Sequence, residues 1–152
     1  MASQTIPSTA TPTVASFTPE VKSPAFSGVV QELVTLNTLG TTSATITAAQ
    51  MLGGLIFQPA GTAINTTLDT AANVFLAMQS VQVGSSFTLT IRNTATAANT
   101  ITVVAGTGGT MSGTATIAQN NQRSFRVVIT ALGDVNGVGA AYTAYTSGSG
   151  TY

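Results

Sequence analysis

Two stretches of this sequence alternate between apolar and polar side chains, and this alternation restricts the chain to a β-rich fold. The stretches are FTLTIRN, residues 87–93, and RSFRVVITAL, residues 123–132. Their alternating apolar positions are Phe87, Leu89, Ile91, Phe125, Val127 and Ile129. A side-chain period of two is that of a strand with one buried face. We therefore predict two strands that contribute these side chains to a core.

Shorter β-type stretches, rich in Thr, Ile and Val and bounded by Gly, Pro or Asn, occur around these two strands. The expected strands cover residues 41–47, 54–58, 62–68, 99–105 and 114–118, with a last strand from Ala140 and a Gly/Ser tail behind it. Short loops between strands favour a meander or Greek key, and the number of strands suffices for a β-sandwich or jelly-roll-like body. The predicted fold class is all-β with one or two short helices.

Two segments show helical signals instead. AAQMLGG, from Ala48, predicts a helical turn that Gly53 ends in the left-handed conformation. DTAANVFLAMQS, residues 69–80, has apolar side chains at the i, i+3, i+4 and i+7 positions of a short amphipathic helix, with Asp69 as its expected N-cap. VVQELVTLN, which follows Gly28, fits either a strand lead-in or a single helical turn.

The glycine-rich stretch GTGGTMSG, residues 106–113, has the composition of a phosphate-binding loop without its context. Such a loop needs a helix behind it and a lysine that reaches the phosphates. Met111 and Ser112 stand where Gly-Lys would be, and residues 114–118 have a strand pattern. We therefore predict a hairpin connection between the strands at 99–105 and 114–118.

Charged residues make up 5% of the 152 residues, and the net charge is zero; ordinary soluble domains contain about 25%. Without excess positive charge, the chain has no electrostatic attraction for nucleic acid or anionic lipid, so neither is an expected partner. No window of the sequence approaches the length of an apolar membrane span. Near-zero net charge also removes repulsion between copies, so an oligomer is expected rather than a monomer.

Cysteine and histidine are both absent from the sequence. Their absence excludes thiol and Ser-His-Asp catalysis and zinc sites of the Cys/His type. The carboxylates are Glu20, Glu32, Asp69 and Asp134. Asp69 is assigned to the helix cap and Asp134 to an Asx-type turn, which leaves no pair for acid–base chemistry. We expect no enzyme activity, no metal and no cofactor.

The first 28 residues are rich in Pro, Ser and Thr, and their prolines recur too often for a regular strand or helix. This composition fits a disordered tail, or an extended arm whose spaced apolar side chains enter pockets on a partner. The apolar side chains are Val14, Phe17, Val21 and Phe26. We favour the binding arm, and divide the chain into an arm, residues 1–28, and a β-rich body, residues 29–152. MASQTIPSTATPTVAS lacks the basic and apolar regions of a signal peptide, so export through a secretory leader is not expected.

Four side chains in the predicted strands are candidates for an interface between copies of the chain. They are Arg92, Arg126, Tyr142 and Tyr145. Arginines on polar strand faces can bind sulfate, sialate or phosphate groups, but more often they pair across strands. Tyrosines can stack on sugars or anchor an interface. We predict that these four side chains contribute to an interface between copies of the chain.

The runs SSFTLTIRNTATAANTITVVAGTGG and GTATIAQNNQRSFRVVIT, with the Pro/Thr-rich start and the scarcity of charge, resemble small structural proteins of tailed phages and other icosahedral viruses. The resemblance is especially to capsid decoration (cement) proteins and head-fibre-like proteins. It implies a non-enzymatic β-rich protein, commonly a homotrimer, that sits on the capsid exterior and clamps neighbouring subunits of the major capsid protein. The arm would lie across capsid subunits and the body would form a knob. The alternative is a receptor- or glycan-binding fibre module.

Overall fold

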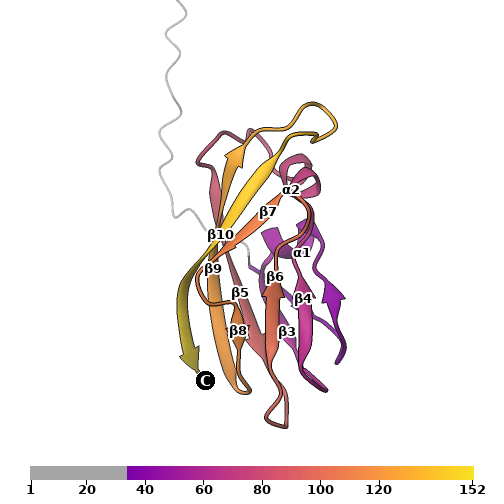
Figure 1. The fold of residues 1–152 in the computed structure, drawn as a ribbon, viewed down its shortest axis with the longest axis vertical. Coiled ribbons are helices and arrows are strands. Elements are labelled where there is room, and N and C mark those ends of the chain that lie inside the picture. Colours follow the sequence, from indigo (N-terminus) through magenta and orange to yellow (C-terminus); the bar gives the residue numbers. More distant parts are fainter. Residues whose placement is uncertain (1–33) are drawn as a thin grey trace, which may run out of the picture. The chain divides into compact units, whose positions relative to one another are not determined.

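The structure, a computed structural model, describes residues 34–152, all of which belong to one compact unit, Glu32–Tyr152. Two β-sheets and two short helices make up the described part (Figure 1). The predicted β-rich class is therefore confirmed. The predicted arm lies outside the described residues, and so do its four apolar side chains, Val14, Phe17, Val21 and Phe26.

The chain moves between the two sheets strand by strand from β1 to β9, so no consecutive strands in this part are neighbours in one sheet. The larger sheet contains, in spatial order, β1 (Thr35–Thr38), β3 (Gly54–Gln58), β5 (Ser86–Asn93), β9 (Asn121–Ala131), β10 (Ala141–Thr151) and β7 (Gly109–Ser112). The smaller sheet contains β2 (Ala44–Thr45), β4 (Ile64–Thr67), β6 (Ile101–Val104) and β8 (Thr116–Ile117).

Parallel pairing is the main departure from the predicted meander or Greek key. β1, β3 and β5 run parallel in the larger sheet, and β2, β4 and β6 run parallel in the smaller one. After the first strand of each sheet, the chain crosses to the other sheet and returns before it forms the next strand. Such a crossover restores the strand direction that a hairpin would reverse. Hairpin pairing occurs between β9 and β10, which Figure 1 shows as a long antiparallel pair.

The glycine-rich stretch is a strand rather than a turn. β6 and β8 do pair antiparallel, with Ile101 opposite Ile117, so that part of the hairpin prediction is confirmed. The residues between them, however, form β7, which pairs parallel with β10 at the edge of the larger sheet. Gly109 is required there because a side chain at this position would collide with the ring of Tyr142. No helix follows the stretch, which agrees with the exclusion of a phosphate loop.

Both helices, α1 (Ala48–Leu52) and α2 (Ala71–Ala77), begin in the same way. The Oγ1 of Thr47 accepts the N–H of Gln50 at 3.3 Å, and the Oγ1 of Thr70 accepts the N–H of Asn73 at 3.2 Å. The prediction of Asp69 as N-cap was therefore wrong by one residue. A threonine cap satisfies an N–H group that the first helical turn otherwise leaves unpaired.

The left-handed residue after α1 is also one position later than predicted. Gly53 has φ −67°, whereas Gly54 has φ +83°. Gly54 begins β3, so the residue that ends the helix geometry also starts the next strand. For the region following Gly28, the sequence left a strand and a helical turn as alternatives. Its described part contains the short strand β1.

The core lies between the two sheets and beneath the helices. Its large buried side chains include Ile56, Leu89, Ile91, Phe125, Val127 and Ile129 from the larger sheet, Ile64, Ile101 and Ile117 from the smaller sheet, and Met51 and Val74 from the helices. The predicted inward positions of β5 and β9 are confirmed, although Phe87 is only partly buried. Each large apolar side chain buried in this way stabilises the fold by about 1.5–3 kcal/mol.

Buried polar side chains fix the turns where β3 and β5 leave the larger sheet. Gln58 and Asn93 end these strands and are level with each other. The Nε2 of Gln58 donates to the carbonyl of Thr42 at 3.0 Å, and the Nδ2 of Asn93 donates to the carbonyls of Asn99 and Ile117 at 2.9 and 3.1 Å. These hydrogen bonds replace the ones that the two amide groups lose with water when they are buried.

The predicted Gly/Ser tail is part of β10, which continues to Thr151. Its last residues pair with the first residues of β9, Asn121 to Ser124, so backbone hydrogen bonding rather than side-chain pattern extends the strand. The predicted strand at 41–47 is shorter in the structure, where only Ala44–Thr45 pair as β2. The lengths of β10 and β2 therefore depend on how far the strand beside each of them extends.

We expect Gly109→Ala to destabilise the body by about 1–3 kcal/mol, because overpacking a filled core costs this much. The new methyl group would meet the buried Tyr142 ring. Gly148→Ala is the matched control, since nothing lies near its Cβ position. Urea unfolding of both variants measures the difference, and equal midpoints would show that the ring moves aside without cost.

Candidate functional site

Asp69 binds donors from both helices. Its Oδ2 accepts the N–H of Ala48, the first residue of α1, at 2.6 Å. Its Oδ1 accepts the N–H of Thr70 and the Nδ2 of Asn73, both at 2.8 Å. One carboxylate therefore holds the start of α1 against the start of α2. Its oxygens are engaged by the fold rather than directed to an open site.

Tyr142 lies inside the chain, with 1% of its surface exposed. Its hydroxyl donates to the carbonyl of Asp69 at 2.9 Å and accepts the N–H of Gly106 at 3.2 Å. Burial raises the pKa of the Tyr142 hydroxyl, and the nearby Asp69 charge raises it further, while the Gly106 bond acts in the opposite direction. The alternation of β10 turns Tyr142 inward and Tyr145 outward. Tyr142 therefore has no surface for the interface that the sequence assigned to it.

Asp134 forms the Asx-type turn expected from the sequence. Its Oδ1 accepts the N–H groups of Asn136 and Val138 at 2.8 and 2.9 Å. No group of three potential metal-ligating side chains exists within residues 34–152. Both carboxylates in the described part thus accept hydrogen bonds within the fold, Asp134 inside its own loop and Asp69 from the starts of the two helices.

The larger sheet has an outer face, which we define by the side chains turned away from the smaller sheet. It includes Leu36, Leu55, Phe57, Thr88, Thr90, Arg92, Arg126 and Tyr145. Register places Arg126 between Thr88 on β5 and Tyr145 on β10. Arg126 Nη1 donates to Thr88 Oγ1 at 3.4 Å, and Tyr145 is 45% exposed. Two of the predicted interface residues are therefore direct neighbours on an open surface.

Arg92 occupies a different part of the outer face, between two aromatic rings. Its Cζ lies 3.2 Å from the ring centre of Tyr152 and 5.1 Å from that of Phe57. The Tyr152 hydroxyl donates to the carbonyl of Asn93, which holds the ring in place. Arg92 Nε is buried and has no hydrogen-bond partner among the described residues. Contacts between a cation and an aromatic face contribute about 0.5–2 kcal/mol, more when they are shielded from water. Arg92 therefore packs between the two rings.

A shallow hollow of about 360 Å³ lies on the outer face beside β1. It is lined by Val34, Gly54, Leu55, Thr88 and Thr90. None of these side chains is charged, and the two larger ones are aliphatic. The hollow therefore suits an apolar side chain better than a polar ligand.

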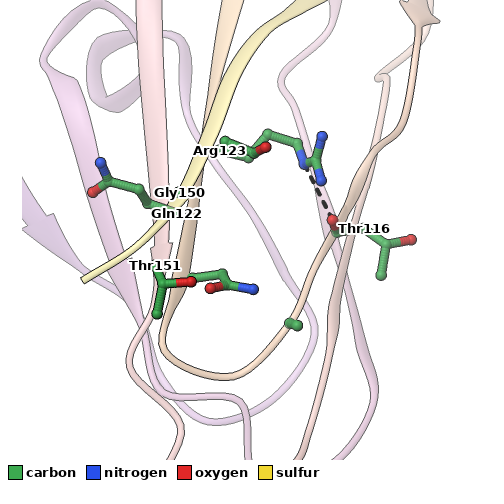
Figure 2. Close-up of a pocket in the computed structure, with 8 residues that line it drawn as sticks. Thr116, Gln122, Arg123, Gly150 and Thr151 are labelled. Carbon is green, nitrogen blue, oxygen red and sulfur yellow. Dashed lines mark hydrogen bonds between the residues drawn. The ribbon is translucent and has the colours of Figure 1, made fainter.

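A second hollow, of about 240 Å³, lies near the end of β10 (Figure 2). Its lining residues are Thr116, Ala118, Asn121, Gln122, Arg123, Ser149, Gly150 and Thr151. Arg123 Nε donates to the carbonyl of Thr116 at 3.1 Å, as the dashed line in Figure 2 shows. The lining offers hydroxyl, amide and guanidinium groups but no carboxylate. It can hold a ligand by hydrogen bonds, and it contains no acid–base pair.

Sequence reasoning missed the contributions of Leu36, Leu55, Phe57 and Tyr152 to the outer face. One signal was available, because GLIFQ, residues 54–58, has consecutive apolar side chains rather than alternating ones. Such a run is typical of a strand that is covered on both faces. The contact of Tyr152 with Arg92 had no sequence signal, because it depends on how β10 pairs with β9.

Comparison with known proteins found no matching family model, no matching curated protein and no matching solved structure. No helix within residues 34–152 is long and apolar enough to cross a membrane.

We expect Asp69→Ala to destabilise the body by about 2–4 kcal/mol, since it leaves the N–H of Ala48 and that of Thr70 without their acceptor. Asp134→Ala is the matched control, because its lost bonds lie in an exposed loop. Chemical denaturation compares the two variants. A loss from Asp134→Ala as large as that from Asp69→Ala would contradict the joining role of Asp69.

Proposed function

We propose that the protein is a non-enzymatic virion structural protein, a capsid decoration (cement) protein that binds and stabilises the shell of a major capsid protein. The observation that carries the proposal is the outer face of the larger sheet. It combines exposed Leu36 and Tyr145 with partly buried Leu55 and Phe57. A face with apolar and aromatic side chains and few charges has the composition of a protein interface core. The resemblance of the sequence to viral structural proteins indicates that the partner is a capsid shell.

In this proposal the outer face joins copies of the chain into a homotrimer. Tyr145 and Arg126 belong to the residue types that contribute most to binding free energy when an interface covers them. They are neighbours here, with Tyr145 still open to solvent. With a net charge of zero for the whole sequence, little long-range repulsion opposes the association.

The N-terminal arm, residues 1–28, carries the attachment to the major capsid protein. The two sheets of the body form a sandwich-like knob on the capsid exterior. Val14, Phe17, Val21 and Phe26 enter apolar pockets on the shell, and burial of each phenylalanine stabilises the complex by roughly 1.5–3 kcal/mol. Neither nucleic acid nor a membrane takes part. The protein is made in the host cytoplasm and joins the particle there.

A fibre module that binds a receptor or glycan is the second candidate. The observation that favours it is the polar hollow of about 240 Å³ near the end of β10, which contains Arg123 and several hydroxyl and amide groups. Such groups hydrogen-bond to sugars and to their sulfate or carboxylate substituents. Glycan-array binding that Arg123→Ala abolishes would favour this function over the decoration protein.

Sedimentation of the purified protein at micromolar concentration is expected to show a trimer. Replacing Arg126 and Tyr145 together by Ala should weaken the association by at least about tenfold, as expected where interface anchors are removed. Val135→Ala is the control, because Val135 is 90% exposed in a loop away from the outer face. A wild-type monomer, or equal weakening by Val135→Ala, would contradict the proposed interface.

Removal of residues 1–28 should leave the β signal in circular dichroism and sharply reduce binding to undecorated shells. The double substitution Phe17→Ala, Phe26→Ala should weaken binding more than about tenfold, because two apolar anchors are lost. Ser8→Ala, Ser16→Ala is the control in the same segment. Co-sedimentation with shells measures binding, and undiminished binding by the truncated protein would place the contact on the body.

A further inference from the structure

The loop that joins β9 to β10 (Figure 1) contains Asn136-Gly137, the one Asn-Gly pair in the sequence. An asparagine before a glycine is prone to spontaneous deamidation. The reason is that glycine has no Cβ to hinder the approach of its backbone nitrogen to the side-chain carbonyl carbon of the asparagine. Asn136 is exposed in the structure, so its amide group is open to water.

The fold requires glycine at position 137. Gly137 has φ +78°, in the left-handed region that a side chain disfavours. It is buried, and a Cβ at this position would lie 2.9 Å from both Cα and Cβ of Ala72 in α2. The glycine that makes Asn136 reactive is therefore fixed by the packing of the loop on α2.

Hydrogen bonds within the loop hold the reacting nitrogen back. The N–H of Gly137 donates to the carbonyl of Asp134 at 2.9 Å. The carboxylate of Asp134 strengthens this turn, because its Oδ1 accepts the N–H groups of Asn136 and Val138 at 2.8 and 2.9 Å. An amide nitrogen attacks only after it has lost its proton, and a hydrogen-bonded N–H loses its proton only when the bond opens. The turn must therefore open before Asn136 can react.

We propose that Asn136 is a deamidation site and that Asp134 controls its rate by keeping the turn closed. When the turn opens, hydroxide removes the proton of the Gly137 nitrogen, which then forms a bond to Cγ of Asn136. The bond from Cγ to Nδ2 breaks, and the amide group leaves as ammonia with a proton from water, which returns the hydroxide. Water then opens the succinimide ring at Cγ to give aspartate, or at the main-chain carbonyl to give isoaspartate.

The reaction changes the contact between the loop and α2. Either product places a second carboxylate in the turn of Asp134, and two like charges close together repel each other. Isoaspartate also adds an atom to the main chain, which displaces the N–H groups that bind Asp134. We therefore expect the loop to loosen from α2 after deamidation. This inference is independent of the capsid assignment, since it concerns the loop alone.

Incubation of the full-length protein at neutral and mildly alkaline pH, followed by peptide mapping with mass spectrometry, tests the proposal. Asn136 should react at least about tenfold more slowly in the folded protein than in the guanidinium-unfolded protein. Asp134→Ala should accelerate the reaction of the folded protein at least about fivefold, because two hydrogen bonds of the turn are lost. Asp134→Asn, which keeps an oxygen acceptor, should stay closer to the wild type. Asn136→Ser is the blank.

Asn120 is an internal reference, because it is also exposed but is followed by Asn121, whose side chain hinders the attack. It should react more slowly than Asn136 in the unfolded protein. Amide exchange of the Gly137 N–H in the wild-type protein, measured by NMR, is a second test that needs no substitution. Exchange there should be slowed by about the same factor as the deamidation.

Equal deamidation rates of Asn136 in the folded and unfolded wild-type protein would overturn the protection by the turn. Exchange of the Gly137 N–H at the rate of a free peptide would overturn it as well. An unchanged rate in a folded Asp134→Ala variant, as judged by circular dichroism, would contradict the role of Asp134. An unfolded protein in which Asn136 reacts no faster than Asn120 would overturn the site itself.

Discussion

The carboxylate and carbonyl of Asp69 join three parts of the body at one residue. The carboxylate accepts the first N–H of α1 and two donors at the start of α2, and the carbonyl accepts the Tyr142 hydroxyl of β10. Helices as short as these have little stability of their own in water. They nevertheless return the chain from the smaller sheet to the larger one, so the parallel pairing of β1, β3 and β5 depends on their position. Asp69 thus connects the parallel strands to the β9–β10 hairpin.

This use of Asp69 has a consequence for function. With Asp69 held by helix donors and Asp134 by its own turn, the carboxylates of the described body are engaged in hydrogen bonds within the fold. The surface that the body offers a partner includes the outer face of the larger sheet, with exposed Leu36 and Tyr145. Contacts of that kind suit assembly, which is why the decoration protein is the function that we favour.

Side-chain periodicity predicted which residues point inward, and the burial of Leu89, Ile91, Phe125, Val127 and Ile129 confirms it. It carries no information on which strand lies beside which, so the parallel crossovers were missed. The capping residue was misplaced although a signal existed: Thr-Ala-Ala-Gln at 47–50 and Thr-Ala-Ala-Asn at 70–73 are the same motif. The same strand parity that buries Tyr142 exposes Tyr145. The Arg92 contacts, in contrast, depend on residues from three strands and could not be predicted.

We infer that Asp69 makes the helices and both sheets one cooperative unit. Native-state amide exchange in increasing denaturant tests it most directly, because it separates local opening from global unfolding. We expect the N–H of Ala48 to exchange with the same free energy and denaturant dependence as the core amides of β5 and β9. Exchange of Ala48 through a low-energy opening that does not depend on denaturant would show that α1 moves independently, and would contradict the claim.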